Sequence, residues 1–331
     1  MREWFKLSED DRKEIIKQTS SKAGLLPAAI EKDWWVMIAM RAIFSSKYKD
    51  VIVFKGGTSL SKSWNIIERF SEDIDLAIDR SFFDFTGSLT RKGVIKLRKT
   101  SCAFIVDEFM PYLNEHLTEL GVQDFELAIV EFERSDTDPI AIELRYKSLT
   151  EEIEYLKPRI LIEISSRSLR DPFEDKENQS IIGKTYPDKI FSDKPISVPS
   201  VLPTRTLLEK IFLLHEEFQK PDKTKIRSSR MTRHLYDISR IMETEYLEKA
   251  LEDDELYDVI VKHREMLTKV SWVDYSKHQR KDIDFIPPKE VIKEWEKDYS
   301  EMQESMFYGE SEKFNELIEK LKGLNAKLNK L

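Results

Sequence analysis

The chain has 331 residues, of which 40% are hydrophobic and 35% are charged, a balance typical of a soluble protein with one large or two modest domains. The formal net charge of −8 argues against a protein that coats nucleic acid non-specifically, because such proteins are usually basic. We expect a cytoplasmic protein without a membrane span, a signal peptide or an internal disulfide, because the apolar runs are short and Cys102 is the only cysteine.

Helices and strands alternate in the first part of the chain. The apolar pattern of residues 8–44 predicts helices. A short β-branched run at residues 51–54 (VIVF) ends at two glycines and predicts a buried strand, and residues 59–70 then predict a helix. Residues 73–78 predict a second strand, and residues 94–120 predict a further helical segment that ends at a glycine.

The later part of the chain changes from strands to helices. Three strand-like runs lie at residues 124–133, 140–148 and 159–166. Residues 171–203, marked by proline and lysine, predict a loop or a domain crossing, and nearly everything beyond them has a helical pattern. We therefore expect an α+β protein, with residues 1–200 forming an α/β core with N-terminal helices and residues 201–331 forming a helical domain.

The stretch FKGGTSLSKSWNIIERFSEDIDLAI, residues 54–78, contains the clearest chemical signal. In a strand, alternate side chains share a face, so we expect Asp73 and Asp75 to point one way and the apolar residues between them the other. Two carboxylates in this arrangement suit a hard cation such as Mg²⁺, which takes one or two carboxylates together with water and phosphate oxygens.

The turn before the two aspartates suits an anion. Gly56 and Gly57 let the backbone approach a ligand closely, and the start of the following helix presents free N–H groups. Thr58 and Ser59 add hydroxyl donors. Gly-Gly or Asp-x-Asp alone is a weak signal. Together they suit a nucleoside triphosphate with a metal ion, because the turn would bind the phosphates and the carboxylates would bind the metal ion. Neither the Walker motif nor the dinucleotide-binding fingerprint is present.

The order of a strand, the Gly-Gly-Thr-Ser turn, a short helix and an Asp-x-Asp strand resembles that of the polymerase-β-type nucleotidyltransferases, whose signature is Gly-Gly/Ser, a spacer and Asp-x-Asp. Within that superfamily the chain is most similar to the AbiEii/AbiGii-type toxins of bacterial toxin–antitoxin and phage-defence systems. The resemblance covers at least residues 28–240 and is carried by FKGGTSLSK, RFSEDIDL, the upstream IEKDWWV and the later TLLEKIFLL and RHLYDISRI. It implies a polymerase-β-like nucleotidyltransferase core.

The resemblance also implies a role for each residue of the signature. Gly57, Thr58 and Ser59 would hold the β- and γ-phosphates of a nucleoside triphosphate, and Asp73 and Asp75 would bind two Mg²⁺ (or Mn²⁺) ions. An acceptor hydroxyl would attack the α-phosphorus and pyrophosphate would leave, without a covalent enzyme intermediate.

Basic residues around the turn are further candidates for nucleotide binding. Lys55 and Lys62 flank the turn and are placed in this group together with Gly56. Lys62 and Arg69, however, fall in the short predicted helix, where lysine and arginine side chains are usually solvated.

The family usually takes a third carboxylate from a later strand, as a general base or a metal ligand. Glu163, in ILIEIS, is the preferred candidate, because an acid in an otherwise apolar strand needs a partner or a metal ion. Glu143, in IAIELRY, is its competitor. The structural alternative for Glu163 is a buried salt bridge to an arginine such as Arg167.

Two predicted helices of the second domain complete the candidate site. Lys210 stands in an apolar helix (LLEKIFLL), where the resemblance implies a phosphate contact and the alternative is a lysine at the edge of a core helix. Asp237 resembles the family's Asp in its R-x-x-Y-D helix and would position Lys210 or the acceptor. Many relatives have R-D-x-x-D there, and His234 at the first Asp position is a minor candidate for a phosphate or base contact.

The acceptor is the part that the sequence determines least. The resemblance implies RNA, in particular tRNA 3′ ends, and a protein antitoxin as a partner. Possible RNA contacts lie in a basic segment, at Lys223, Lys225, Arg227, Arg230 and Arg233. Two alternatives stay open: a small-molecule nucleotidyltransferase, and a non-catalytic module that binds a nucleotide or a partner.

Overall fold

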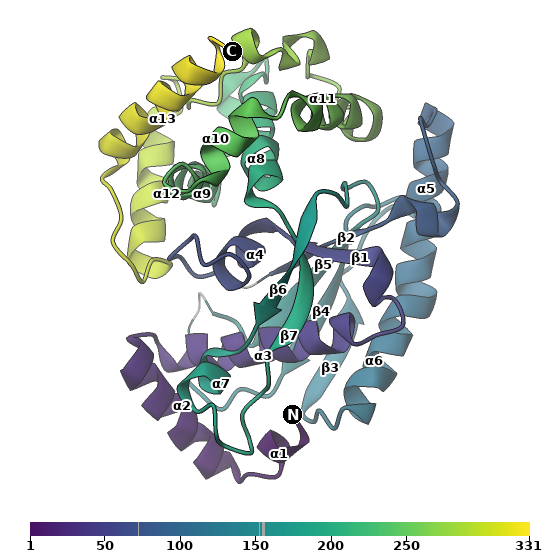
Figure 1. Cartoon of the computed structure of the whole chain (residues 1–331), viewed down its shortest axis with the longest axis vertical. Helices are drawn as coiled ribbons and strands as arrows, with labels where there is room; N and C mark the ends of the chain where they lie inside the picture. Colours follow the sequence, from purple (N-terminus) through teal and green to yellow (C-terminus); the bar gives the residue numbers. More distant parts are fainter. Residues whose placement is uncertain (72, 152, 154–155) are drawn as a thin grey trace. The chain divides into compact units, whose positions relative to one another are not determined.

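The chain divides into two units (Figure 1). The structure is a computed structural model that describes residues 1–71, 73–151, 153 and 156–331. Unit 1 consists of Met1–Trp64 and Phe70–Val201, and unit 2 consists of Asn65–Arg69 and Leu202–Leu331. The division lies one residue beyond the boundary expected from the sequence, whereas no sequence pattern predicts that Asn65–Arg69 belongs with the C-terminal helices.

A mixed sheet forms the centre of unit 1 (Figure 1). Its seven strands, counted over the described residues, run in the order β3-β4-β5-β2-β1-β7-β6. Their bounds are β1 (Ile52–Lys55), β2 (Ile74–Ile78), β3 (Phe125–Ile129), β4 (Ile140–Tyr146), β5 (Arg159–Ser165), β6 (Phe173–Asn178) and β7 (Ile196–Val201). The middle strand β2 lies antiparallel to β1 and parallel to β5, so the α+β class predicted from the sequence is confirmed.

One face of this sheet packs into the main core of unit 1. Ile74, Leu76 and Ile78 of β2 are fully buried there, as the alternation along the strand predicts. They share this core with α3 (Pro27–Phe44), a helix that is apolar on nearly every side and therefore buried. Asp75 and Ala77, which alternate with them along β2, point to the opposite face, where Ala77 packs in a smaller apolar cluster with Val53 and Val201.

Besides α3, the α-helices of unit 1 in the described residues are α1 (Arg2–Phe5), α2 (Glu9–Ala23), α4 (Gly56–Lys62), α5 (Arg91–Phe104), α6 (Met110–Glu119) and α7 (Ile181–Thr185). The helix predicted over residues 59–70 corresponds to α4 and is wrong at both ends. Helix α4 thus begins at the first glycine of the turn and ends at Lys62. Asn65 has a φ of 52°, a left-handed conformation that a right-handed helix does not contain, so the helical pattern of the following residues is not realised.

The loop predicted over residues 171–203 is also wrong, because this stretch contains β6, α7 and β7. The sequence of β6 is FEDKEN, whose charged side chains hide the strand, and β7 contains Pro199, which normally argues against a strand. Strand β6 lies at the edge of the sheet and pairs with β7 alone, and charged side chains are common at such edges.

Unit 2 is helical, as the pattern beyond residue 203 predicts. Its α-helices in the described residues are α8 (Pro203–Phe218), α9 (Thr232–Ile241), α10 (Tyr246–Glu252), α11 (Asp254–His263), α12 (Ile292–Ser305) and α13 (Phe314–Leu328). Large aromatic side chains, among them Phe285, Trp295 and Tyr299, are fully buried in it. No helix in the described part of the chain has the length and apolar character needed to cross a membrane.

Candidate active site

Two carboxylates lie side by side on the face of the sheet opposite the main core. Asp75 on β2 is in register with Glu163 on the parallel strand β5, and on its other side it is in register with Lys55 on β1. Residues in register on neighbouring strands share a face, and the strands lie about 4.8 Å apart. The sheet therefore brings together an aspartate and a glutamate that are far apart in the sequence, with a lysine opposite the aspartate.

The glycine turn is bonded directly to the start of the strand that carries Asp75. The hydroxyl of Thr58 donates a hydrogen bond to the backbone oxygen of Asp73 and lies 2.9 Å from the hydroxyl oxygen of Ser71. Thr58 is fully buried. Its hydroxyl thus holds the turn against Asp73, and a phosphate contact by Thr58 stays a prediction.

Ser59 is in the opposite situation. Its side chain is only 2% exposed, and within the described residues its hydroxyl oxygen has no hydrogen-bond partner. Buried hydroxyl groups are nearly always hydrogen-bonded, so this one is available to a polar ligand. Of the two hydroxyl residues in the turn, Ser59 is the better candidate for a phosphate contact.

Gly56 must be a glycine for two separate reasons. Its φ is +78°, in the left-handed region that favours glycine. A Cβ atom added here would lie 2.8 Å from Cγ and 3.0 Å from Cβ of Asp75, and closer still to one carboxylate oxygen. The backbone of the turn therefore lies directly against the Asp75 carboxylate.

We predict that Gly56→Ala displaces the Asp75 carboxylate and lowers nucleotide transfer about 100-fold, because misplacing a reacting group by about 1 Å has an effect of that size. Gly87→Ala is the matched control, since Gly87 also has a positive φ (+64°) but nothing within 4 Å of an added Cβ. Steady-state transfer rates and thermal unfolding of both variants provide the measurement. Equal losses of activity in both would show that backbone strain, and not contact with Asp75, explains Gly56.

Lys62 has a partner within unit 1. Its ammonium group forms an ion pair with Asp33 of α3, and the other oxygen of Asp33 accepts a hydrogen bond of 2.8 Å from the backbone N–H of Ile181. Asp33 is buried. Lys62 thus fixes α4 to α3, and a nucleotide contact by this residue stays a prediction.

Glu163 lies beside Asp75 in the sheet, whereas Glu143 lies on β4, one strand further away, and is bound by two arginines. Both oxygens of Glu143 accept hydrogen bonds, at 2.6 Å from Arg159 and 2.7 Å from Arg145. Although burial opposes it, these hydrogen bonds hold the pKa of Glu143 below its ordinary value. Arg167, the residue considered as a salt-bridge partner of Glu163, has its Nε atom 3.2 Å from Asp138.

A second cluster of charged residues lies inside unit 2. Asp237 accepts two hydrogen bonds of 2.7 Å from the guanidinium group of Arg69, and one of its oxygens lies 2.9 Å from Nζ of Lys210. Asp237 is completely buried, and Arg69 and Lys210 are 2% and 8% exposed. Although burial opposes it, the two positive charges hold the pKa of Asp237 well below its ordinary value.

This cluster carries an excess of positive charge. Burial lowers the pKa of Lys210, and Asp237 opposes that shift. Burial and the charge of Lys210 also lower the pKa of His234 well below its ordinary value, so His234 is neutral at pH 7 and its Nδ1 accepts from Lys210 at 3.3 Å. Two cations against one anion make a site that attracts a further anion, and Lys210 has a third N–H beyond those that face Asp237 and His234.

Arg69 is the residue that sequence reasoning missed. Its position in a predicted short helix indicated a solvated side chain, but it is buried because it lies outside α4 and pairs with Asp237, 168 residues away. The available signal was its place in RFSEDIDL, next to an apolar residue and four residues before Asp73. A buried arginine requires such a partner.

Several basic residues of the proposed RNA-binding segment have acceptors nearby. Arg227 and Lys220 both bind the carboxylate of Glu217, Lys223 donates to the backbone oxygen of Phe218, and Lys225 lies 3.6 Å from Asp222. Lys225, Arg227 and Arg230 are exposed and Arg233 is half-buried. The segment thus presents basic side chains to solvent, but with part of their charge balanced locally.

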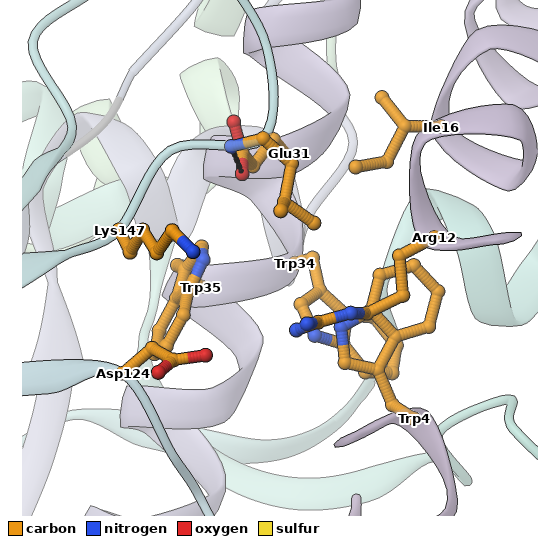
Figure 2. A pocket seen from close by; sticks show the side chains of 9 residues that line it. Trp4, Arg12, Ile16, Glu31, Trp34, Trp35, Asp124 and Lys147 are labelled. Atoms are coloured by element: carbon orange, nitrogen blue, oxygen red, sulfur yellow. Dashed lines mark hydrogen bonds between the residues drawn. The ribbon is translucent and has the colours of Figure 1, made fainter. Parts of the chain in front are cut away.

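A small recess lies near the N-terminus in unit 1 (Figure 2). It is lined by Trp4, Arg12, Ile16, Glu31, Trp34, Trp35, Asp124, Lys147 and Leu149. Its cavity volume is about 10 Å³, which is enough for one water molecule. None of the predicted site residues lines it, and it is far too small for a nucleotide.

The family described as "Nucleotidyl transferase AbiEii toxin, Type IV TA system" matches residues 38–320. No curated protein matches the chain. MenT4, a nucleotidyltransferase toxin of Mycobacterium tuberculosis H37Rv, is 16% identical over 87% of this chain and 98% of its own, with a TM-score of 0.43. JHP933 of Helicobacter pylori is 15% identical over 83% of this chain and 97% of its own, with a TM-score of 0.35.

Proposed function

The chain belongs to the AbiEii family of nucleotidyltransferase toxins of type IV toxin–antitoxin systems, and from this premise we propose that it is a Mg²⁺-dependent enzyme that transfers a nucleoside monophosphate from a nucleoside triphosphate to an RNA hydroxyl. The observation that carries the proposal is the register of Asp75 with Glu163 on adjacent strands, directly against the backbone of Gly56. An anion-attracting turn beside paired carboxylates has a clear use if a metal ion and a triphosphate bridge them.

The residues present fit a hard divalent cation. Asp75 and Glu163 offer oxygen ligands from neighbouring strands. Asp73, which lies two residues before Asp75 in the sequence, offers a further carboxylate. No three His, Cys, Asp or Glu side chains among the described residues are grouped closely enough to hold a metal ion alone, and Mg²⁺ commonly completes its shell with waters and substrate phosphates. When bound, Mg²⁺ or Mn²⁺, as a pair of ions, would lower the pKa of the acceptor hydroxyl and stabilise the departing pyrophosphate.

The chain's own side chains would hold the nucleotide. The unpartnered hydroxyl of Ser59 and the backbone of Gly57 would donate to phosphate oxygens, while Thr58 keeps the turn in place. For Lys210 we propose a phosphate contact through its third N–H, supported by the positive charge of its cluster. Asp237 would then act as a positioning residue that holds Lys210.

For the acceptor we propose the 3′ end of a tRNA, and we place the reaction in the cytoplasm. The support is the family together with the exposed basic side chains of residues 223–233. As a toxin of a toxin–antitoxin system the protein has an antitoxin counterpart, and we propose that this is a protein encoded by a neighbouring gene.

The experiment that tests the proposal offers several acceptors in parallel. The protein is incubated with Mg²⁺, total RNA and each α-³²P nucleoside triphosphate in turn. We expect label in the tRNA fraction of that RNA, and we expect chelation by EDTA to abolish labelling. Label in a small-molecule extract but not in RNA would favour the small-molecule alternative. Nucleotide binding with no transfer to any acceptor would instead favour the non-catalytic module.

A further inference from the structure

Trp272 is a large aromatic side chain that faces solvent in unit 2. It is 44% exposed, whereas the remaining tryptophans of the chain are buried or half-buried. Among the described residues, no other aromatic ring packs against it. A single exposed apolar residue is common on protein surfaces and needs no explanation by itself, so the surroundings of Trp272 decide whether it has a role.

The turn that carries Trp272 is fixed at both ends. It spans residues 270–273 and is closed by a backbone hydrogen bond of 3.2 Å. The first backbone N–H of the turn donates to the hydroxyl of Tyr275 at 2.8 Å. Just after the turn, the backbone N–H of Asp274 donates to the side-chain oxygen of Gln219, also at 2.8 Å. The indole ring is thus presented on an ordered turn, which lowers the entropy cost of binding a ligand.

A cation lies over the indole ring. Nζ of Lys220 is 5.5 Å from the ring centroid of Trp272, within the range of cation–π attraction. The same ammonium group donates to Glu217 at 2.6 Å and to the backbone oxygen of Lys225 at 2.8 Å. Lys220 therefore joins Trp272 to the basic segment of residues 223–233, in which the side chains of Lys225 and Arg227 are exposed.

An exposed aromatic ring beside positive charges is the arrangement by which many proteins bind single-stranded nucleic acid. The cations bind phosphates, and the ring stacks on a base, which every base permits because each has a π-face. Bases inside a duplex already stack on one another, so an aromatic side chain reaches only a base that is unpaired and unstacked. The surroundings of Trp272 therefore suit a single strand and not a duplex.

A protein partner fits this surface less well. The centre of a protein interface gathers aromatic and apolar residues and is depleted in charged ones. The exposed residues that lie nearest to Trp272 in the chain are instead polar or charged, namely Lys269, Ser271 and Asp274. A lone ring in polar surroundings matches a flat base better than an apolar protein surface.

We propose that Trp272 is a stacking site for an unpaired nucleobase of an RNA strand whose phosphates are bound by Lys225 and Arg227. The inference rests on the proposed function for the identity of the nucleic acid, and it narrows the acceptor to an RNA with a single-stranded segment, such as a tRNA 3′ end. Trp272 thereby acts in binding the acceptor and takes no part in the chemical step.

The affinity of the whole chain for a labelled single-stranded oligoribonucleotide tests this site. Fluorescence anisotropy in EDTA measures binding without nucleotide transfer. We expect Trp272→Ala to weaken binding of the single strand about tenfold, because stacking on one base contributes about that factor, and to leave binding of a blunt-ended duplex unchanged. Trp272→Phe should keep most of the affinity. Val259→Ala is the matched control, because it removes another exposed apolar side chain of unit 2 and should bind both RNAs as the wild type does.

Two further measurements separate stacking from damage to the turn. Stacking on a base quenches tryptophan emission, so the single strand should quench the emission of the wild type, and Trp272→Phe should lose that part of the quenching. The salt dependence of binding should stay the same in Trp272→Ala, whereas it should become less steep in Lys225→Gln, which removes a phosphate contact.

The possible results separate the stacking site from the proposed function. Unchanged single-strand affinity in Trp272→Ala, or an equal loss for the duplex, would overturn the stacking site. Loss of binding to the antitoxin with unchanged RNA affinity would also overturn it and would assign Trp272 to a protein interface. If RNA binds through Trp272 but is not labelled when Mg²⁺ and nucleotide are supplied, the proposed function fails while the stacking site stands.

Discussion

Asp75→Asn is expected to lower nucleotide transfer about 1,000-fold or more, because a metal ion stabilises transition-state charge by several kcal/mol and about 4 kcal/mol corresponds to that factor. Asparagine keeps the shape of the side chain and removes only its charge. Asp75 has Lys55 in register on one side and Glu163 on the other. Removing the negative charge of Asp75 therefore loses an attraction to Lys55 and relieves a repulsion from Glu163. We therefore expect the unfolding temperature without ligands to change little.

The same experiment separates the candidate third carboxylates. Glu163→Gln should resemble Asp75→Asn, whereas Glu143→Gln should keep its transfer rate and lose stability, because it disturbs hydrogen bonds from Arg145 and Arg159. Transfer of α-³²P label and thermal unfolding, each with and without Mg²⁺ and nucleotide, are the measurements. Ligands that bind the native state raise the unfolding temperature, so this rise should vanish in Asp75→Asn. A wild-type rate in Asp75→Asn would contradict the site.

Local patterns predict the site's components well because they depend on neighbouring residues. The alternation through Asp73 and Asp75 predicts which side chains enter the core, and the two glycines predict a turn with close backbone approach. Both expectations rest on strand geometry and on the φ of a single residue. The order of turn, helix and acidic strand is likewise present in the structure, although α4 is shorter and begins earlier than predicted.

What the sequence does not predict depends on pairing between distant residues. Glu163 could be preferred as an acid in an apolar strand, but its register with Asp75 follows from the strand order β5-β2-β1. Arg69 looks solvated in isolation and is buried only because Asp237 meets it from α9. The strand character of β6 is likewise invisible in FEDKEN, since pairing with β7 determines it.

Asp237→Asn is expected to lower the free energy of unfolding of unit 2 by about 3–5 kcal/mol, since removing one partner of a buried ion pair leaves an uncompensated buried charge. Here two cations lose their partner, because Arg69 and Lys210 both bind Asp237. Urea unfolding followed by far-UV circular dichroism is the measurement. Glu245→Gln is the control, because it removes an exposed carboxylate paired with Lys249 in the same unit and should change stability little.

The pH dependence of this stability separates charge from packing. The pKa of Asp237 is lowered in the folded protein, so its contribution is complete above the unfolded-state value of about 4 and is lost as the pH falls below it. The stability difference between wild type and Asp237→Asn should therefore shrink progressively below pH 4. Replacing Arg69, Lys210 and Asp237 together with apolar residues of similar size should recover much of the stability but no transfer activity, because the positive charge would be gone. Recovery of both would show that the cluster serves the fold alone.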